Sequence, residues 1–152
     1  EPDALGGRVD LRGRCPRAYA IDADSTDFRD DALSLDLATG QLCVHIADLT
    51  GVVKAGGALD ETARLRLQSI YASAMPLHML PPSLLQHACL SADEPNECIT
   101  AMLQLDAFGR VRHCQVVRSL VPPIRALSFA DVDALLREDD ISSQARRPPP
   151  HT

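Results

Sequence analysis

The chain has 152 residues, of which 45% are hydrophobic but only 3% aromatic, and its formal net charge is −6. This length is sufficient for one domain whose core is filled mainly by aliphatic side chains. The negative charge argues against a free-standing nucleic-acid-binding domain, which normally carries a basic excess. No apolar run of about 18 residues is present to span a membrane. The five cysteines form no C-x-x-C pair, so we expect reduced thiols in an intracellular protein rather than a zinc site.

The first half of the chain is predicted to contain three strands and one helix. Residues 1–17 are polar and include Gly6-Gly7, which indicates an N-terminal arm. Alternating apolar residues on both sides of Thr39-Gly40 favour a hairpin. Asp60 can cap the helix. The expected elements are strands at 18–21, 32–38 and 42–47 and a helix at 60–74. The apolar positions spaced for one face of that helix are Ala63, Leu67, Ile70, Tyr71 and Ala74.

The second half is predicted to add another hairpin and a final helix capped by Ser128. The expected elements are a short turn or helix at 83–87, strands at 97–105 and 111–120 joined by Phe108-Gly109, and a helix from Phe129 to Arg137. That helix would point Phe129, Val132, Leu135 and Leu136 inward. Residues 139–152 are polar and proline-rich, as in a disordered or partner-bound tail. The predicted fold class is α/β (α+β), with mixed and antiparallel strands in hairpins and two main helices.

The loop after the first strand concentrates negative charge. Within ten residues it carries Asp22, Asp24, Asp27, Asp30 and Asp31. Carboxylates at this density repel each other, unless water solvates them fully or cations neutralise them. The pattern therefore leaves two interpretations open: a solvated acidic turn, or a cation-binding loop.

Seven short motifs surround this loop in a fixed order. They are R-x-D-L-R at 8–12, Y-A-I-D at 19–22, D-D-A-L-S at 30–34, V-H-I-A-D at 44–48, L-D-x-x-A-x-x-R at 59–66, S-I-Y at 69–71 and M-L-P at 79–81. In this order and at these spacings the chain resembles the N-terminal half of the catalytic (RNB) domain of the ribonuclease II and ribonuclease R family. The form of the motifs is closest to the branch found in cyanobacteria and organelles. The resemblance implies that residues 18–138 are the N-terminal half of an RNB-like domain.

Members of this family hydrolyse single-stranded RNA from its 3′ end and release nucleoside 5′-monophosphates with the help of magnesium. The resemblance implies that Asp22, Asp30 and Asp31 bind Mg²⁺, that Asp30 and Asp31 are catalytic, and that Tyr71 stacks on RNA. For Tyr71 a position in the core is an equal alternative. His45 and Asp48 are interpreted as shape-determining residues of a strand end.

The chain departs from the family pattern at the acidic loop. The position of the fourth family carboxylate holds Phe28, and Arg29 follows it. Asp27 stands one residue early and would have to swing in. The bulky ring and the fixed positive charge both lower the expected metal affinity. The sequence also lacks the later half of the family's catalytic domain, which carries a phosphate-gripping arginine segment, and Ala72-Ser73 stand where the family has Leu-Pro.

Three hypotheses follow. In the first, the half-domain is catalytically degenerate and is a structural component of a larger RNA-containing assembly, organellar and possibly ribosomal, with RNA and protein subunits as partners. A mitochondrion or chloroplast is then the expected location. In the second, the chain is a fragment of an active magnesium-dependent 3′–5′ exoribonuclease, and the rest of the catalytic domain is either a separate polypeptide or a part that this sequence does not include. In the third, it is a generic α/β interaction domain.

Overall fold

The computed structural model describes residues 7–26, 28–71 and 76–145, with side chains of the last segment described as far as Glu138. Within these ranges the chain forms seven strands, three α-helices and one short 3-10 helix. They are β1 (Val9–Asp10), β2 (Ala18–Asp22), β3 (Asp31–Leu35), β4 (Leu42–Ala47), η1 (Leu49–Gly51), α1 (Ala58–Arg66), α2 (Pro82–Leu85), β5 (Asn96–Leu105), β6 (Val111–Val121), β7 (Ile124–Ser128) and α3 (Phe129–Ala145).

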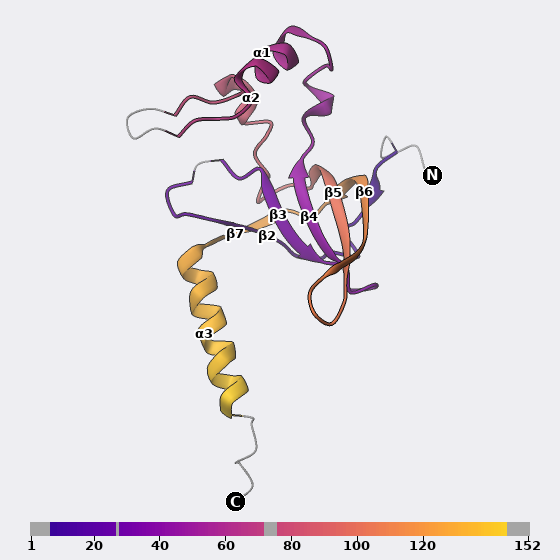
Figure 1. Cartoon of the computed structure of the whole chain (residues 1–152), viewed down its shortest axis with the longest axis vertical. Helices are drawn as coiled ribbons and strands as arrows, with labels where there is room; N and C mark the ends of the chain where they lie inside the picture. Colours follow the sequence, from indigo (N-terminus) through magenta and orange to yellow (C-terminus); the bar gives the residue numbers. More distant parts are fainter. Residues whose placement is uncertain (1–6, 27, 72–75, 146–152) are drawn as a thin grey trace, which may run out of the picture.

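All seven strands join one sheet in the order β1-β6-β5-β4-β3-β2-β7. The central neighbours from β2 to β6 pair antiparallel, whereas β1 pairs parallel with β6 and β7 pairs parallel with β2. Figure 1 shows α1 and α2 together beyond one end of the sheet, with α3 leaving the end of β7 in the opposite direction. The predicted mixed α/β class, with strands in hairpins, is confirmed.

Both predicted hairpins form where local turn chemistry favours them. The β3–β4 turn contains Gly40 at φ 70°, and the β5–β6 turn contains Gly109 at φ 77°. Glycine takes such positive φ angles without the steric cost that a Cβ atom brings. In the second turn the Asp106 carboxylate also accepts hydrogen bonds from the backbone N–H groups of Phe108 and Arg110.

Two strands were not predicted from the sequence, because each forms only by pairing with a distant segment. β7 follows Pro122-Pro123 and lies beside β2 over five residue pairs. β1 lies within the expected N-terminal arm and pairs with β6, and Leu11 and Cys15 just after it are fully buried. Part of the arm therefore belongs to the sheet and its core.

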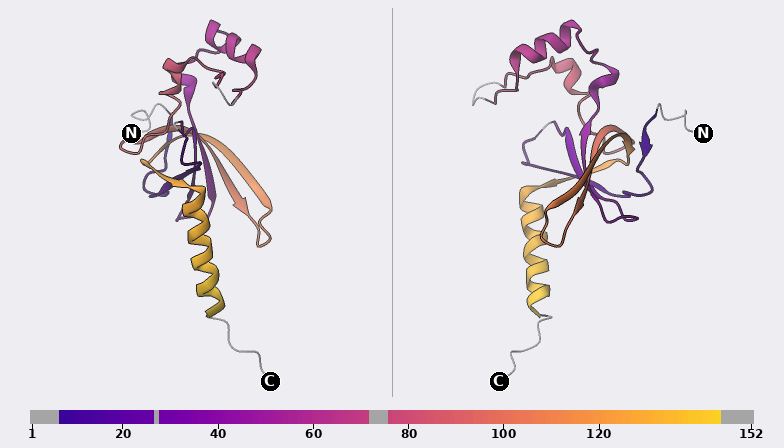
Figure 2. Two further views of the ribbon diagram at one scale, coloured as in Figure 1. Left: turned by 90° about the vertical axis from the view of Figure 1, so that its left-hand side faces the viewer. Right: turned by 45° about the vertical axis from the view of Figure 1, so that its right-hand side comes forward.

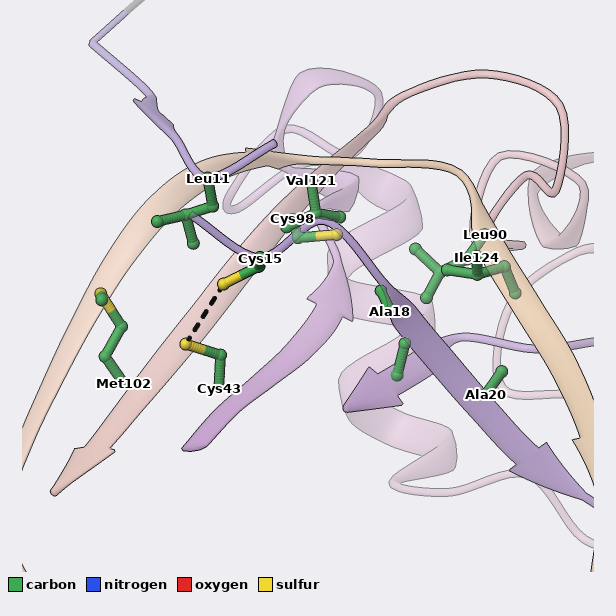
Figure 3. Packing of buried hydrophobic residues seen from close by; sticks show 11 residues of the cluster. Leu11, Cys15, Ala18, Ala20, Cys43, Leu90, Cys98, Met102, Val121 and Ile124 are labelled. Atoms are coloured by element: carbon green, nitrogen blue, oxygen red, sulfur yellow. Dashed lines mark hydrogen bonds between the residues drawn. The ribbon is translucent and has the colours of Figure 1, made fainter. Parts of the chain in front are cut away.

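The two faces of the sheet differ in side-chain size. The buried face carries many small or polar residues: Ala18, Ala20, Ala32, Ser34, Cys43, His45, Cys98, Thr100 and Ser119. Figure 3 shows the hydrophobic members of this core, among them Ala18, Ala20 and Cys98. The opposite face carries larger aliphatic side chains that are partly or largely exposed, among them Leu33, Leu35, Ile46 and Val116. Alternation along the strands places the two sets on opposite faces.

Helix α1 is shorter than predicted. It ends at Arg66 rather than near residue 74, because Leu67 takes φ 65° and breaks the helical path. The chain then forms the Ile70–Leu77 bridge. Residues 72–75, at the expected helix end, lie outside the described residues.

The start of α1 and its expected apolar face also need correction. The helix begins after Gly57, and Asp60 lies inside it, where its carboxylate accepts a hydrogen bond from the N–H of Gly56. Among the described residues of the predicted apolar face, Ala63 alone is buried, whereas Leu67, Ile70 and Tyr71 are exposed. The helical spacing was present, but no element in the described part of the chain covers these residues.

Helix α3 continues to Ala145, beyond the predicted end at Arg137 and into the segment expected to be a tail. Figure 2 shows that it projects away from the sheet in both further views. Phe129, Leu135 and Leu136, which were expected to point inward, are therefore exposed. Of the helices that the structure describes, none combines the length and apolar character needed to cross a membrane.

Candidate functional site

The candidate carboxylates lie at the end of two neighbouring strands. Asp22 ends β2 and Asp31 begins the antiparallel β3, so the loop between them starts and finishes at one edge of the sheet. The carbonyl of Asp30 accepts a hydrogen bond from the N–H of Ala47 at 2.9 Å, which fixes this residue beside the end of β4. Three residues that are spread over ten positions of the sequence therefore lie at adjacent strand ends.

Their charges act on one another. The pKa of Asp31 is raised, first because burial disfavours its charged form and then because the carboxylates of Asp30 and Asp22 repel it. The carboxylates of Asp22 and Asp30 are therefore close enough to Asp31 to affect its charge. A cation in their midst would relieve this repulsion.

The nearest described cation is the guanidinium of Arg29. Its Nε lies 3.7 Å from Oδ2 of Asp22, and the two side chains are only 28% and 21% exposed. Neither atom has a hydrogen-bond partner, although both are buried. The backbone of Arg29 is held by the N–H of Leu90, which donates to its carbonyl at 2.7 Å. Arg29 thus neutralises part of the charge that a metal ion would neutralise.

The described residues do not fit a magnesium site. Among them, no three or more His, Cys, Asp or Glu side chains converge so that they could hold a metal ion. Magnesium requires a nearly octahedral set of oxygen ligands at about 2.1 Å, whereas the carboxylate of Asp22 faces a guanidinium. Asp27, which was expected as a possible substitute ligand, lies outside the described residues.

Phe28, at the position of the fourth family carboxylate, belongs to a cluster of three rings. Its ring meets that of His78 edge-on at 5.5 Å between centroids, and His78 meets Tyr71 in the same way at 6.0 Å. Arg66 donates a hydrogen bond to the carbonyl of His78 at 2.9 Å. Tyr71 is 78% exposed, so it is not a core residue, and its ring is accessible for stacking.

The sequence interpretation missed His78. Its signal was weak, because a single histidine in front of M-L-P has no partner at helical or strand spacing. The Ile70–Leu77 bridge brings Tyr71 close to His78, and His78 in turn contacts Phe28 from a distant part of the sequence.

His45 and Asp48 stabilise the strands behind the site, which agrees with a shape-determining role. His45 is fully buried and its ring nitrogens lie 2.7 Å from the hydroxyls of Ser34 and Thr100, so it links β3, β4 and β5. Burial lowers the pKa of His45 to about 4. The ring is therefore neutral at physiological pH.

Asp48 is the centre of a buried ion-pair network. Its Oδ2 lies 2.7 Å from Arg8 and 3.1 Å from Arg118, and its other oxygen accepts hydrogen bonds from Thr50. Burial raises the pKa of Asp48, but the hydrogen bonds from Thr50, Arg8 and Arg118 outweigh it and hold the pKa well below its ordinary value. The network joins the first motif, at Arg8, to the end of β4.

Comparison with known proteins identifies the family of this chain. The sequence matches the RNB domain family over residues 8–148. It is 34% identical over 140 residues to an uncharacterized ribonuclease of Synechocystis sp., a match that covers 89% of this chain and 21% of the relative. The chain therefore belongs to the RNB family, and it spans about a fifth of the length of the curated relatives it matches.

Solved structures confirm the fold. Ribonuclease R of Mycoplasma genitalium in complex with ribose-methylated single-stranded RNA matches with a TM-score of 0.75 at 23% identity, over 90% of this chain and 21% of that chain. Yeast Ssd1, described as a pseudonuclease, matches with a TM-score of 0.72 at 21% identity, over 90% of this chain and 17% of that chain. The fold is thus found both in a ribonuclease and in a protein described as a pseudonuclease.

Proposed function

We propose that this chain is the N-terminal half of a catalytically degenerate RNB domain that contributes an RNA-contacting, structural part of a larger RNA-containing assembly. The observation that carries the proposal is the ion pair of Arg29 with Asp22, together with Phe28 at the position of the fourth carboxylate. A guanidinium cannot release a hydroxide nucleophile from bound water or adapt its geometry as a divalent ion does. The site keeps its negative charge but lacks the arrangement for metal-assisted hydrolysis.

The proposal also assigns roles to Asp30, Asp31 and Tyr71. Asp30 and Asp31 correspond to catalytic residues that no longer act in hydrolysis. Tyr71 is the residue on which an RNA base would still stack. Similarity to a cyanobacterial ribonuclease supports an organellar host, in a mitochondrion or chloroplast, of which a ribosome is one candidate. Protein and RNA subunits of that assembly would be the partners.

Metal titration of a repaired site tests the proposal. The double variant Phe28→Asp with Arg29→Ala restores a carboxylate and removes the competing guanidinium. We expect calorimetry to detect Mn²⁺ or Mg²⁺ binding to the double variant, not to the wild-type chain, and Asp30→Asn in the variant to abolish it. Asp24→Asn, an exposed loop residue, is the matched control. The proposal is wrong if the wild-type chain releases mononucleotides from a 3′-tailed RNA in magnesium.

A second candidate, an active exoribonuclease completed by another polypeptide, is favoured by one specific observation. Leu33, Leu35 and Ile46 are exposed on the outer face of the sheet, and a groove of about 380 Å³ is lined there by Tyr19, Leu35 and neighbouring residues. Nothing in the described part of the chain covers this face, and contiguous exposed apolar surface marks an interaction site. The expected occupant is the second half of an RNB domain.

The two candidates differ in a reconstituted complex. If the second is correct, a complex of this chain with the complementary half hydrolyses RNA, and Asp30→Asn abolishes the activity. If Asp30→Asn leaves the activity of the complex unchanged, this chain supplies no catalytic carboxylate and the second candidate fails.

A further inference from the structure

Two cysteine side chains from separate segments face each other in the core. Cys15 lies between β1 and β2, and Cys43 lies on β4. Their Sγ atoms are 3.9 Å apart, and Figure 3 shows the two sulfurs directed toward one another. Both side chains are fully buried. Closing the gap to a disulfide bond of about 2.05 Å requires the two sulfurs to approach each other by about 2 Å.

We propose that Cys15 and Cys43 are a redox modification site, at which hydrogen peroxide converts the two thiols into a reversible disulfide. The Cys15 thiolate attacks one peroxide oxygen, the O–O bond breaks, and a sulfenic acid and water form. Cys43 then attacks the sulfenic sulfur, the S–S bond forms, and the S–O bond breaks to release a second water. Two thiols are oxidised and one peroxide is reduced, so atoms and electrons balance.

The surroundings assign the two steps to different cysteines. The side-chain interaction with Cys43 is the main cause that lowers the pKa of Cys15 to about 7, against burial, with a smaller contribution from Ser34. The same pairing and burial raise the pKa of Cys43. Because the thiolate is the nucleophilic form, Cys15 attacks first and Cys43 resolves the intermediate. Peroxide is small enough to reach a buried pair during brief local openings.

The disulfide would act on the candidate site through the segment that it encloses. The two cysteines are 28 residues apart, and the intervening segment contains β2, the acidic loop and β3. Asp22 and Asp31 therefore lie on strands that the bond would tie to β4. Closing a loop of this length restricts the unfolded chain and is expected to raise the melting temperature by about 10 °C.

The experiment uses the complete chain, first reduced and then exposed to hydrogen peroxide. After the remaining thiols are alkylated, non-reducing peptide mapping by mass spectrometry is expected to find a Cys15–Cys43 link. The melting temperature should rise by about 10 °C and return to its starting value in dithiothreitol. Peptide mapping of the wild type requires no variant to fold.

Variants isolate the pair. Cys15→Ser and Cys43→Ser should each abolish the peroxide-dependent rise, whereas Cys114→Ser, at an exposed position on β6, should retain it. Cys43→Ala serves as the apolar alternative if the serine variants do not give a folded circular dichroism spectrum. The proposal is overturned if peroxide links only other cysteines, if no link forms, or if the rise persists without Cys15. None of these readouts involves RNA or metal, so they are independent of the proposed function.

Discussion

Protonation of His45 should make the protein less stable in mild acid. The ring is fully buried, and both of its nitrogens lie 2.7 Å from hydroxyl groups of neighbouring strands, so a charged imidazolium has no counter-ion at hydrogen-bond distance. Burial lowers its pKa from 6.5 to about 4. Between these two values the unfolded chain binds a proton that the folded protein does not bind. Stability is therefore lost as pH falls from about 6.5 to about 4, and none of this loss is present above 6.5.

The size of this effect follows from the pKa difference. One pKa unit corresponds to about 1.4 kcal/mol, so His45 should lower the free energy of unfolding by about 3 kcal/mol over this interval. Domains of ordinary stability have about 5–15 kcal/mol in total. The loss is therefore large enough to measure. Asp48, whose pKa is lowered, loses its contribution only below about pH 5, so it does not affect the upper part of this interval.

Urea denaturation at several pH values between 4.5 and 7.5 measures the effect. The wild type should lose stability steadily below pH 6.5, while His45→Asn should start from a lower stability and lose much less over the same interval. His113→Asn, at an exposed position on β6, is the matched control and should follow the wild type. Parallel curves for the wild type and His45→Asn would refute the reasoning.

Two further predictions concern the exposed ring of Tyr71 and the ion pairs of Arg8 and Arg12. Tyr71→Ala should weaken single-stranded RNA binding, measured by fluorescence anisotropy, about 5- to 150-fold through loss of one stacked base. Phe108→Ala removes a similarly exposed ring on the β5–β6 turn and should have no effect. Equal losses of affinity for the two variants would contradict the proposed stacking role of Tyr71. Arg8→Met should lower the free energy of unfolding by about 3 kcal/mol, since it removes one buried partner of Asp48. Arg12→Met removes an exposed pair with Asp10 and should cost less than about 1 kcal/mol in the same urea titration. Similar costs for the two arginines would show that burial of the Arg8 pair adds nothing.

The sequence by itself determined the local elements and the family. Both hairpins could be predicted because strand alternation and the glycines at the turns, Gly40 and Gly109, act between residues close in the chain. The order of the motifs identified the RNB family, and their spacing located the loop that brings Asp22 and Asp31 to one edge of the sheet.

Only the tertiary structure decided how that loop is neutralised and which apolar residues are covered. Arg29 follows Asp22 in the same loop, so the sequence already placed a positive charge near the carboxylates, but the path of the folded loop decides that the two groups pair. The contact of Phe28 with His78 joins segments far apart in sequence, and no local pattern encodes their approach. Helical spacing placed Leu135 on an apolar face, but whether another element covers such a face is decided by chain packing. The periodicity of a sequence indicates which residues lie on the same face of an element. Whether that face is buried depends on a second surface that packs against it, and this surface is formed only by the folded chain or by its assembly.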